Sequence, residues 1–155
     1  MKKLFILSAL LSLSMLGHAD ADCNVIGFHQ PGTYVYSGPT TCDLVNLPSI
    51  TVHGTLTVSS SSIAGISTVR GVLTATGSTF SGVTEVSGPI DSSGSVFSSI
   101  SITDNHSPDT ITLSNSTIVK GDITFQGGIS SNNKVIVESG SKLYGKVNNG
   151  IVINQ

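Results

Sequence analysis

The chain has 155 residues, of which 10% are charged and none is tryptophan. Seven lysines and arginines stand against nine aspartates and glutamates, so we expect no basic surface that could hold nucleic acid or an anionic membrane. Ser, Thr, Val, Ile and Gly dominate, and no amphipathic helical stripe is present, which together predict a single all-β domain.

The segment 1–21 has the pattern of a secretory signal peptide. Lys2 and Lys3 precede an uncharged apolar run over residues 4–16, and small residues follow at Ala19 and Ala21. Cleavage after Ala19 and cleavage after Ala21 both fit this pattern. The run is shorter than the ~20 residues that cross a bilayer. We therefore expect an exported protein, periplasmic or secreted, without an integral membrane segment once the leader is removed.

The two cysteines, Cys23 and Cys42, both follow the leader, and an even count in an exported chain predicts a disulfide. Pro-Gly and Gly-Pro turn signals flank a short strand expected over residues 33–36. The ends of a stack of strands expose unpaired edges unless they are covered. We expect residues 22–47 to form a disulfide-clamped N-terminal cap of this kind.

Three consecutive 17-residue segments, which begin at His53, Arg70 and Ser87, align without gaps. Gly holds the second position of each segment, aliphatic residues the fourth, Ser the ninth, and apolar residues the eleventh and fourteenth. Such a repeat is typical of a solenoid, in which each coil buries its apolar face against the next. We expect the recurring Gly at a corner with positive φ, and the recurring Ser to bond its own backbone at another corner.

This repeat predicts a parallel β-helix with coils of about 17 residues over residues 48–155. Segments that begin at Ile111 and Val135 continue the pattern, for five or six coils in all. Polar, turn-rich insertions near residues 104–109 and 126–134 are expected to bulge from a corner without breaking the core.

Two segments of the repeat, STIVKGDITF and SGSKLYGKV, resemble the bactofilin family of polymer-forming β-helices, with the matching positions Gly121-Asp122-Ile123 and Gly145-Lys146-Val147. The likeness spans residues 50–150 and is one of periodicity. It implies a small right-handed β-helix that stacks end to end into filaments. Bactofilins typically lack a cleaved leader and a disulfide cap, and a capped N-terminal end would obstruct such stacking. The resemblance therefore bears on the fold more than on the function.

No set of residues predicts a catalytic, cofactor or metal site. The polar cluster within residues 104–109 falls in an insertion and is expected to be a solvated loop. Glu85 and Asp91 occupy different coil positions and need not face each other as the carboxylates of a glycosidase do. His53 begins a coil, where a solvated corner is expected.

The sequence leaves two functions open. The first is a structural or self-assembling β-helix of the bacterial envelope or exterior, without catalytic activity or cofactor, which associates through the ends of the helix. The second is a secreted binding module or adhesin-like protein that recognises a glycan or a host protein through a coil face or the insertions.

Overall fold

The structure is a computed structural model and describes residues 21–23, 32–104, 109–126 and 132–155. These residues form strands and turns, and no helix is found among them. Most of the expected leader, residues 24–31 of the expected cap, and residues 105–108 and 127–131 of the two insertions lie outside the described residues.

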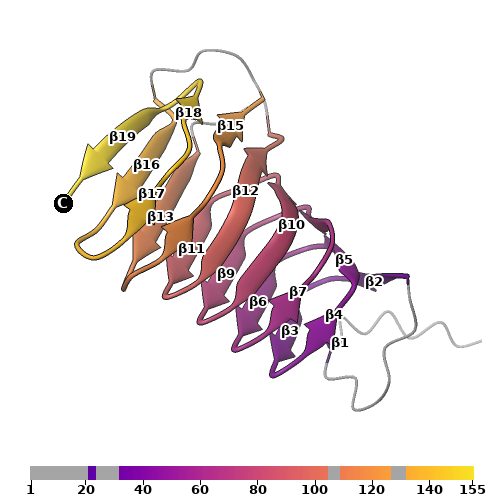
Figure 1. The fold of residues 1–155 in the computed structure, drawn as a ribbon. Helices are drawn as coiled ribbons and strands as arrows, with labels where there is room; N and C mark the ends of the chain where they lie inside the picture. The colour runs from indigo at the N-terminus through magenta and orange to yellow at the C-terminus, as the bar shows by residue number, and fades with distance from the viewer. Residues whose placement is uncertain (1–20, 24–31, 105–108, 127–131) are drawn as a thin grey trace, which may run out of the picture.

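The chain winds into a parallel β-solenoid of about seven turns, which confirms the predicted fold class and adds at least one coil to the predicted number. The first strands and the last strand lie at opposite ends of the stack (Figure 1). One sheet contains eight strands, which are separated by these seven turns. Their order is β1 (Ala21–Asp22), β3 (Thr40–Asp43), β6 (Leu56–Ser59), β9 (Leu73–Thr76), β11 (Ile90–Ser93), β13 (Thr110–Ser114), β16 (Lys134–Val137) and β19 (Ile151–Asn154).

The remainder of each coil belongs to an eleven-stranded sheet that bends at a second corner. Its short strands before that corner are β4 (Asn46–Leu47), β7 (Ser62–Ile63), β14 (Ile118–Val119) and β17 (Lys142–Leu143). Its strands after the corner are β2 (Thr33–Ser37), β5 (Ser49–His53), β8 (Ser67–Val69), β15 (Ile123–Phe125) and β18 (Val147–Asn148). Two long strands run through the corner, β10 (Thr79–Val86) and β12 (Val96–Ile102).

Neighbouring coils pair in register and like residues stack on like, as the repeat predicts. Leu56 pairs with Leu73, and Leu73 with Ile90, so these partners follow the period of the repeat. The register then continues from Ile90 to Ile111 and from Ile111 to Val135. The insertions therefore lengthen two coils without displacing the strands that follow them.

The core is a narrow column of side chains inside the coils. Phe80 and Phe97 stack with ring centroids 4.7 Å apart and an interplanar angle of 5°. Leu56, Leu73 and Ile90 are at most 1% exposed. Burial of such a side chain contributes roughly 1.5–3 kcal/mol. Because each coil supplies only a few of these residues, the core depends on the coils above and below.

The coils begin earlier in the chain than the boundary predicted at residue 48. Strand β2 pairs with β5, β3 with β6, and β4 with β7, all in parallel. Residues 33–47 of the predicted cap are thus a coil themselves. The regular repeat misses this coil because the pairing of Thr40 with Leu56 makes it one residue shorter than the period.

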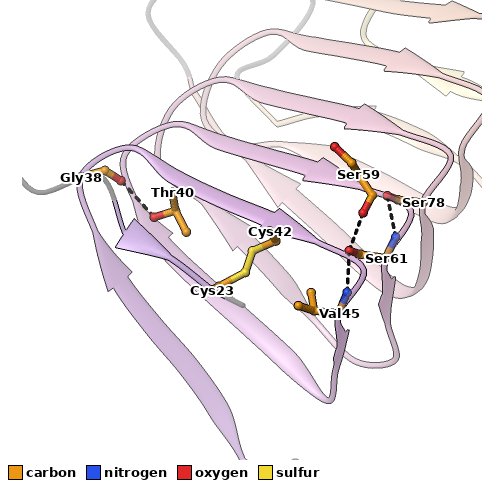
Figure 2. Close-up of a disulfide and its surroundings, with 8 residues drawn as sticks. All are labelled: Cys23, Gly38, Thr40, Cys42, Val45, Ser59, Ser61 and Ser78. Atoms are coloured by element: carbon orange, nitrogen blue, oxygen red, sulfur yellow. Dashed lines mark hydrogen bonds between the residues drawn. A yellow bond between two sulfur atoms is a disulfide. The ribbon is translucent and has the colours of Figure 1, made fainter. Parts of the chain in front are cut away.

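The predicted disulfide between Cys23 and Cys42 is present and fully buried. The bond holds β1 against β3 (Figure 2). Beside it, the Cys23 amide donates to the Thr41 carbonyl at 2.9 Å. The clamp therefore secures the first strand of the eight-stranded sheet.

The recurring serines form a buried ladder along one corner, and they do more than the predicted local turn bond. The Ser61 hydroxyl donates to the Ser59 carbonyl at 2.7 Å and accepts from the Val45 amide of the preceding coil at 3.1 Å (Figure 2). Ser78 and Ser95 repeat both bonds one and two coils further on. Each hydroxyl thus satisfies the corner backbone of two coils.

The recurring glycines do not have the predicted positive φ, and a contact between coils explains them instead. A Cβ added to Gly71 would lie 2.6 Å from the Gly54 carbonyl oxygen, and one added to Gly88 would lie 2.9 Å from that of Gly71. Close stacking of backbone therefore requires these glycines. Residues with left-handed backbone lie instead at the corner of the serine ladder. They form a column with φ between 48° and 62°: Leu44, Ser60, Gly77, Gly94 and Asn115.

The apolar side chain at the fourteenth position of the repeat is buried in only one of the three aligned segments. Ile66 and Val83 are 53% and 41% exposed. Ser67 and Thr84 take the interior place instead, because buried valines two residues further on set the alternation along each strand. In the following coil a one-residue shift of the ladder brings Ile100 into this interior column.

Candidate functional site at the ends of the solenoid

The C-terminal coil leaves the end of the core uncovered. Val152 continues the interior column from Val135, yet it is 44% exposed whereas Val135 is fully buried. Val147, which pairs with the buried Ile123, is only partly buried, and so is Leu143. The end of the core is therefore an apolar surface.

The backbone at this end is also open. Within the described ranges, β19 pairs only with β16, β17 with β14, and β18 with β15. Each of these strands leaves one row of N–H and C=O groups without a strand partner. Exposed edge strands commonly carry charged residues or proline that discourage pairing with another chain. Strand β19, with the sequence IVIN, carries neither.

The side-chain charge of this coil is positive. Lys142 and Lys146 are both exposed, and residues 139–155 contain no aspartate or glutamate. Asp122 of the preceding coil contacts this coil through backbone, since the Lys146 amide donates to Asp122 Oδ1 at 2.8 Å. The two ammonium groups thus lie beside an apolar surface with an open strand edge.

The described side chains at the N-terminal end have the opposite charge. Strands β1 and β2 are the outermost of the described strands in their sheets there. Asp22 and Asp43 are exposed, and no lysine or arginine occurs in residues 21–23 or 32–47. Both acidic residues belong to the strands that the disulfide connects.

Aromatic and aliphatic side chains form the apolar part of this end. Tyr34 and Tyr36 are partly buried against the core, and Val35 between them is 62% exposed. Burial raises the pKa of the Tyr36 hydroxyl, and the neighbouring Tyr34 raises it further. The Tyr36 ring is therefore neutral at physiological pH, so β2 presents an uncharged surface.

The isolated titratable residues singled out in the sequence do not converge. His53 is exposed, at the end of β5. Glu85 lies in β10 of one sheet, where it accepts a hydrogen bond from Thr68 Oγ1 at 3.4 Å, and Asp91 lies in β11 of the other sheet. These two carboxylates come from different faces of the coil.

Of the two residues of the predicted polar cluster that the structure describes, Asp104 and Asp109, only Asp109 is buried. It is 3% exposed, and its Oδ2 has no hydrogen-bond partner among the described residues. Burial raises the pKa of its carboxyl group, and the charge of Asp104 raises it further. Asn105 and His106 lie outside the described residues. In the part of the chain that is described, no three His, Cys, Asp or Glu side chains gather as metal ligands.

A shallow depression lies on the eleven-stranded sheet, beside the second corner. Its volume is about 120 Å³, well below the roughly 300–1,000 Å³ of typical small-molecule sites. It is lined by Thr79, Phe80, Ser81, Val96, Ser98 and Lys120. This depression is too small to enclose a metabolite.

The outer surface of the eight-stranded sheet carries hydroxyl groups in register. Thr41, Thr57 and Thr74 follow one another in a single outward column, which Asp91 interrupts before Thr112. A second column, two residues further on, contains Ser59, Thr76, Ser93 and Ser114. The sequence predicts the individual strands but not this alignment across the coils that differ in length.

No protein-family model, curated protein or solved structure matches the chain. No helix capable of spanning a membrane is found in the residues that the structure describes.

Proposed function

We propose that the protein is an exported structural element that assembles with further copies of itself through the ends of its solenoid, without catalytic activity. One observation carries this proposal. Val152 belongs to the core column but is 44% exposed, on a strand whose outer edge has no partner among the described strands.

Association would satisfy both features of that surface together. A strand added to β19 would pair with the open backbone edge, as in other cases of strand addition. The same contact would remove Val152, Val147 and Leu143 from water, at about 25 cal/mol for each Å² of apolar surface buried. Interior packing and ladder bonding between copies would then resemble those between coils.

Export is supported by two features. The leader pattern of residues 1–21 is that of a secreted chain. The buried Cys23–Cys42 disulfide is compatible with an oxidising compartment, where such bonds persist. A structural element outside the cytoplasm would benefit from a covalent clamp on its first strand.

The test compares two valines of similar exposure. Val152→Lys places a charge on the terminal coil, and Val83→Lys places the same charge at a 41% exposed position in the middle of the rod. We expect the mean mass of the oxidised wild type to rise with concentration in sedimentation velocity. We expect the Val83→Lys variant to behave in the same way and the Val152→Lys variant to remain monomeric. Monomers at every concentration for all three proteins would refute the proposal.

The aligned hydroxyl columns favour a second candidate, a binding module for a glycan. Thr57 and Thr74 are successive members of the outward column, on a regular parallel sheet. A glycan array with the wild type and a Thr57→Lys/Thr74→Lys variant tests this function. A glycan that binds the wild type and not the variant would support the binding function. A wild type that binds no glycan on the array would exclude it.

A further inference from the structure

We propose that the shallow depression beside the second corner, together with the two lysines next to it, binds an acidic polysaccharide whose sugar units carry carboxylate groups. We call this surface the lysine face; it consists of the residues that line the depression and of Ile118, Lys142 and Tyr144. It belongs to the eleven-stranded sheet and is separate from the aligned hydroxyl columns of the other sheet. Binding on the side of the rod does not depend on assembly through its ends.

The depression lies between two outward columns of side chains. One column consists of successive partners in the parallel ladder: Thr79, Val96, Ile118 and Lys142. The other column lies two residues further along the chain in each coil: Ser81, Ser98, Lys120 and Tyr144. Residues two apart in a strand point to the same side. Both columns therefore lead from short side chains at the depression to a lysine nearer the C-terminal coil.

A β-bulge shapes the depression from below. The register between β10 and β12 shifts between Phe80 and Val83, so Ser81 and Gly82 together stand opposite Ser98. Phe80 lines the depression, yet it is 1% exposed because its ring stacks inside the core. Bulges often lie beside binding sites, where they change the direction of a side chain. The backbone and the core beneath thus hold the depression open.

Lys120 and Lys142 supply positive charge to the lysine face. Both are exposed, and neither forms an ion pair within the described part of the chain. Lys120 lines the depression, and Lys142 belongs to the next coil, about 4.8 Å further along the ladder. The two columns contain no acidic residue. Asp122 follows beyond the corner, where its Oδ1 accepts from the Lys146 amide. The face is therefore complementary to a carboxylate, which an ammonium group attracts as a point charge.

The neutral side chains of the face suit a sugar ring. The hydroxyl groups of Thr79, Ser81 and Ser98 surround the depression, and each can both donate to and accept from a sugar hydroxyl. Tyr144 is 67% exposed and offers an apolar ring with a polar tip. The volume of about 120 Å³ cannot enclose a metabolite, but it can receive part of one unit of a chain that continues across the surface.

An acidic peptide fits this face less well. Extended peptides gain affinity by pairing with an open strand edge. The strands under the depression offer no such edge, because β10 lies between β7 and β12, and β12 lies between β10 and β14. Side chains alone have to recognise the ligand here. Hydroxyl and aromatic groups match the hydroxyls and ring faces of a polysaccharide.

Isothermal titration calorimetry with two matched probes tests the inference. One probe is a short oligogalacturonate, and the other is the same oligomer with its carboxyl groups reduced to alcohols. The Lys120→Gln/Lys142→Gln variant removes both charges of the lysine face. Its control, Arg70→Gln/Lys134→Gln, removes two exposed charges of the same sign elsewhere on the rod. Ser98→Leu fills the depression without a change of charge. Thermal unfolding of each variant establishes that it is folded.

We expect the wild type to bind the acidic probe at least about tenfold more tightly than the reduced one, and less tightly when salt screens the charges. Loss of two exposed ion pairs should weaken binding of the acidic probe by about tenfold. Ser98→Leu should weaken it by about fivefold, because a hydrogen-bonding place for the sugar is lost. The control variant should bind as the wild type does.

Several results would overturn the inference. A wild type that does not bind oligogalacturonate, or binds both probes equally, would do so. Equal weakening in the control variant would trace the attraction to overall charge rather than to the lysine face. Unchanged binding by Ser98→Leu would exclude the depression from the site. Tighter binding of poly-glutamate than of oligogalacturonate would make the ligand a peptide. Each of these results leaves the proposed assembly intact, because sedimentation velocity measures it separately.

Discussion

The serine ladder predicts that the same substitution has opposite effects at two buried positions. Ser78 and Ser67 are 1% and 0% exposed. The Ser78 hydroxyl accepts from the Ser61 amide at 3.2 Å and donates to the Thr76 carbonyl at 2.9 Å. The Ser67 hydroxyl has no partner among the described residues. Replacement by alanine removes a satisfied hydroxyl in one case and an unsatisfied one in the other.

The magnitudes follow from these bonds. Ser78→Ala loses a bond worth about 1 kcal/mol net and leaves the buried Ser61 amide without its acceptor, so the free energy of unfolding should fall by about 2 kcal/mol. Thr76 keeps a second donor, because its carbonyl also accepts from the Ser60 amide at 2.9 Å. Ser67→Ala relieves the burial of an unpaired hydroxyl and should raise the free energy of unfolding by as much as ~1 kcal/mol.

Urea denaturation of both variants measures the difference. The Val152→Lys background removes the proposed association, so that the free energy of unfolding does not depend on protein concentration. An unchanged slope with urea shows that a shift in midpoint reflects stability rather than a change in exposed surface. Equal losses at Ser78 and Ser67 would refute the assignment of the ladder as a specific stabilising element.

Three further changes have defined outcomes. Leu44→Asn should raise the free energy of unfolding by about 1 kcal/mol and raise the thermal midpoint with it. Leu44 is 78% exposed and has a φ of 55°, a left-handed conformation that costs leucine roughly 1 kcal/mol and asparagine less. An unchanged midpoint would contradict this. The double change of Cys23 and Cys42 to serine should cost about 3 kcal/mol in urea denaturation, since the bond joins residues 19 apart, and a loss below ~1 kcal/mol would show that the clamp is dispensable. The raised pKa of Asp109 makes the folded state bind its proton more tightly than the unfolded state, so this residue's contribution to stability falls as pH rises from about 4. The gain from Asp109→Asn should therefore be larger at pH 7 than at pH 3, and a gain that is equal at both would exclude this origin.

The parts of the fold that depend on period could be predicted from the sequence. Identical spacing places Leu56, Leu73 and Ile90 in one column, and any parallel winding of a regular repeat gives that result. The predicted start of the coils was wrong because the coil from Thr40 to Leu56 is shorter than the period. A fixed period does not detect a coil that is one residue short.

Side-chain direction near corners could not be predicted from apolarity alone. Ile66 points outward and Ser67 inward because the strand alternates about the buried Val69, and the reverse would expose Val69. The glycine column was predicted, but its cause lies in contacts between coils. Gly71 is required by the carbonyl of Gly54 in the preceding coil, and no local turn rule includes a contact between coils.

The open ends could be predicted only as a general property of solenoids. The sequence shows neither that Val147 and Tyr34 belong to one column nor that the lysines and aspartates lie at opposite ends. Both facts require the register of every coil between them, including the two coils with insertions. The charge difference along the rod emerges only when the coil order is known.

Hydrogen exchange at β19 tests the central claim most directly. The Ile151 and Gln155 amides donate to the preceding coil, to the Asn133 and Val137 carbonyls at 2.9 and 3.0 Å. Because N–H groups alternate in direction along a strand, the Val152 and Asn154 amides face the open edge. We predict that exchange at these two amides slows as protein concentration rises, while the Val83→Lys variant behaves as the wild type. Exchange at Val152 and Asn154 that is fast and independent of concentration would contradict assembly through the C-terminal coil.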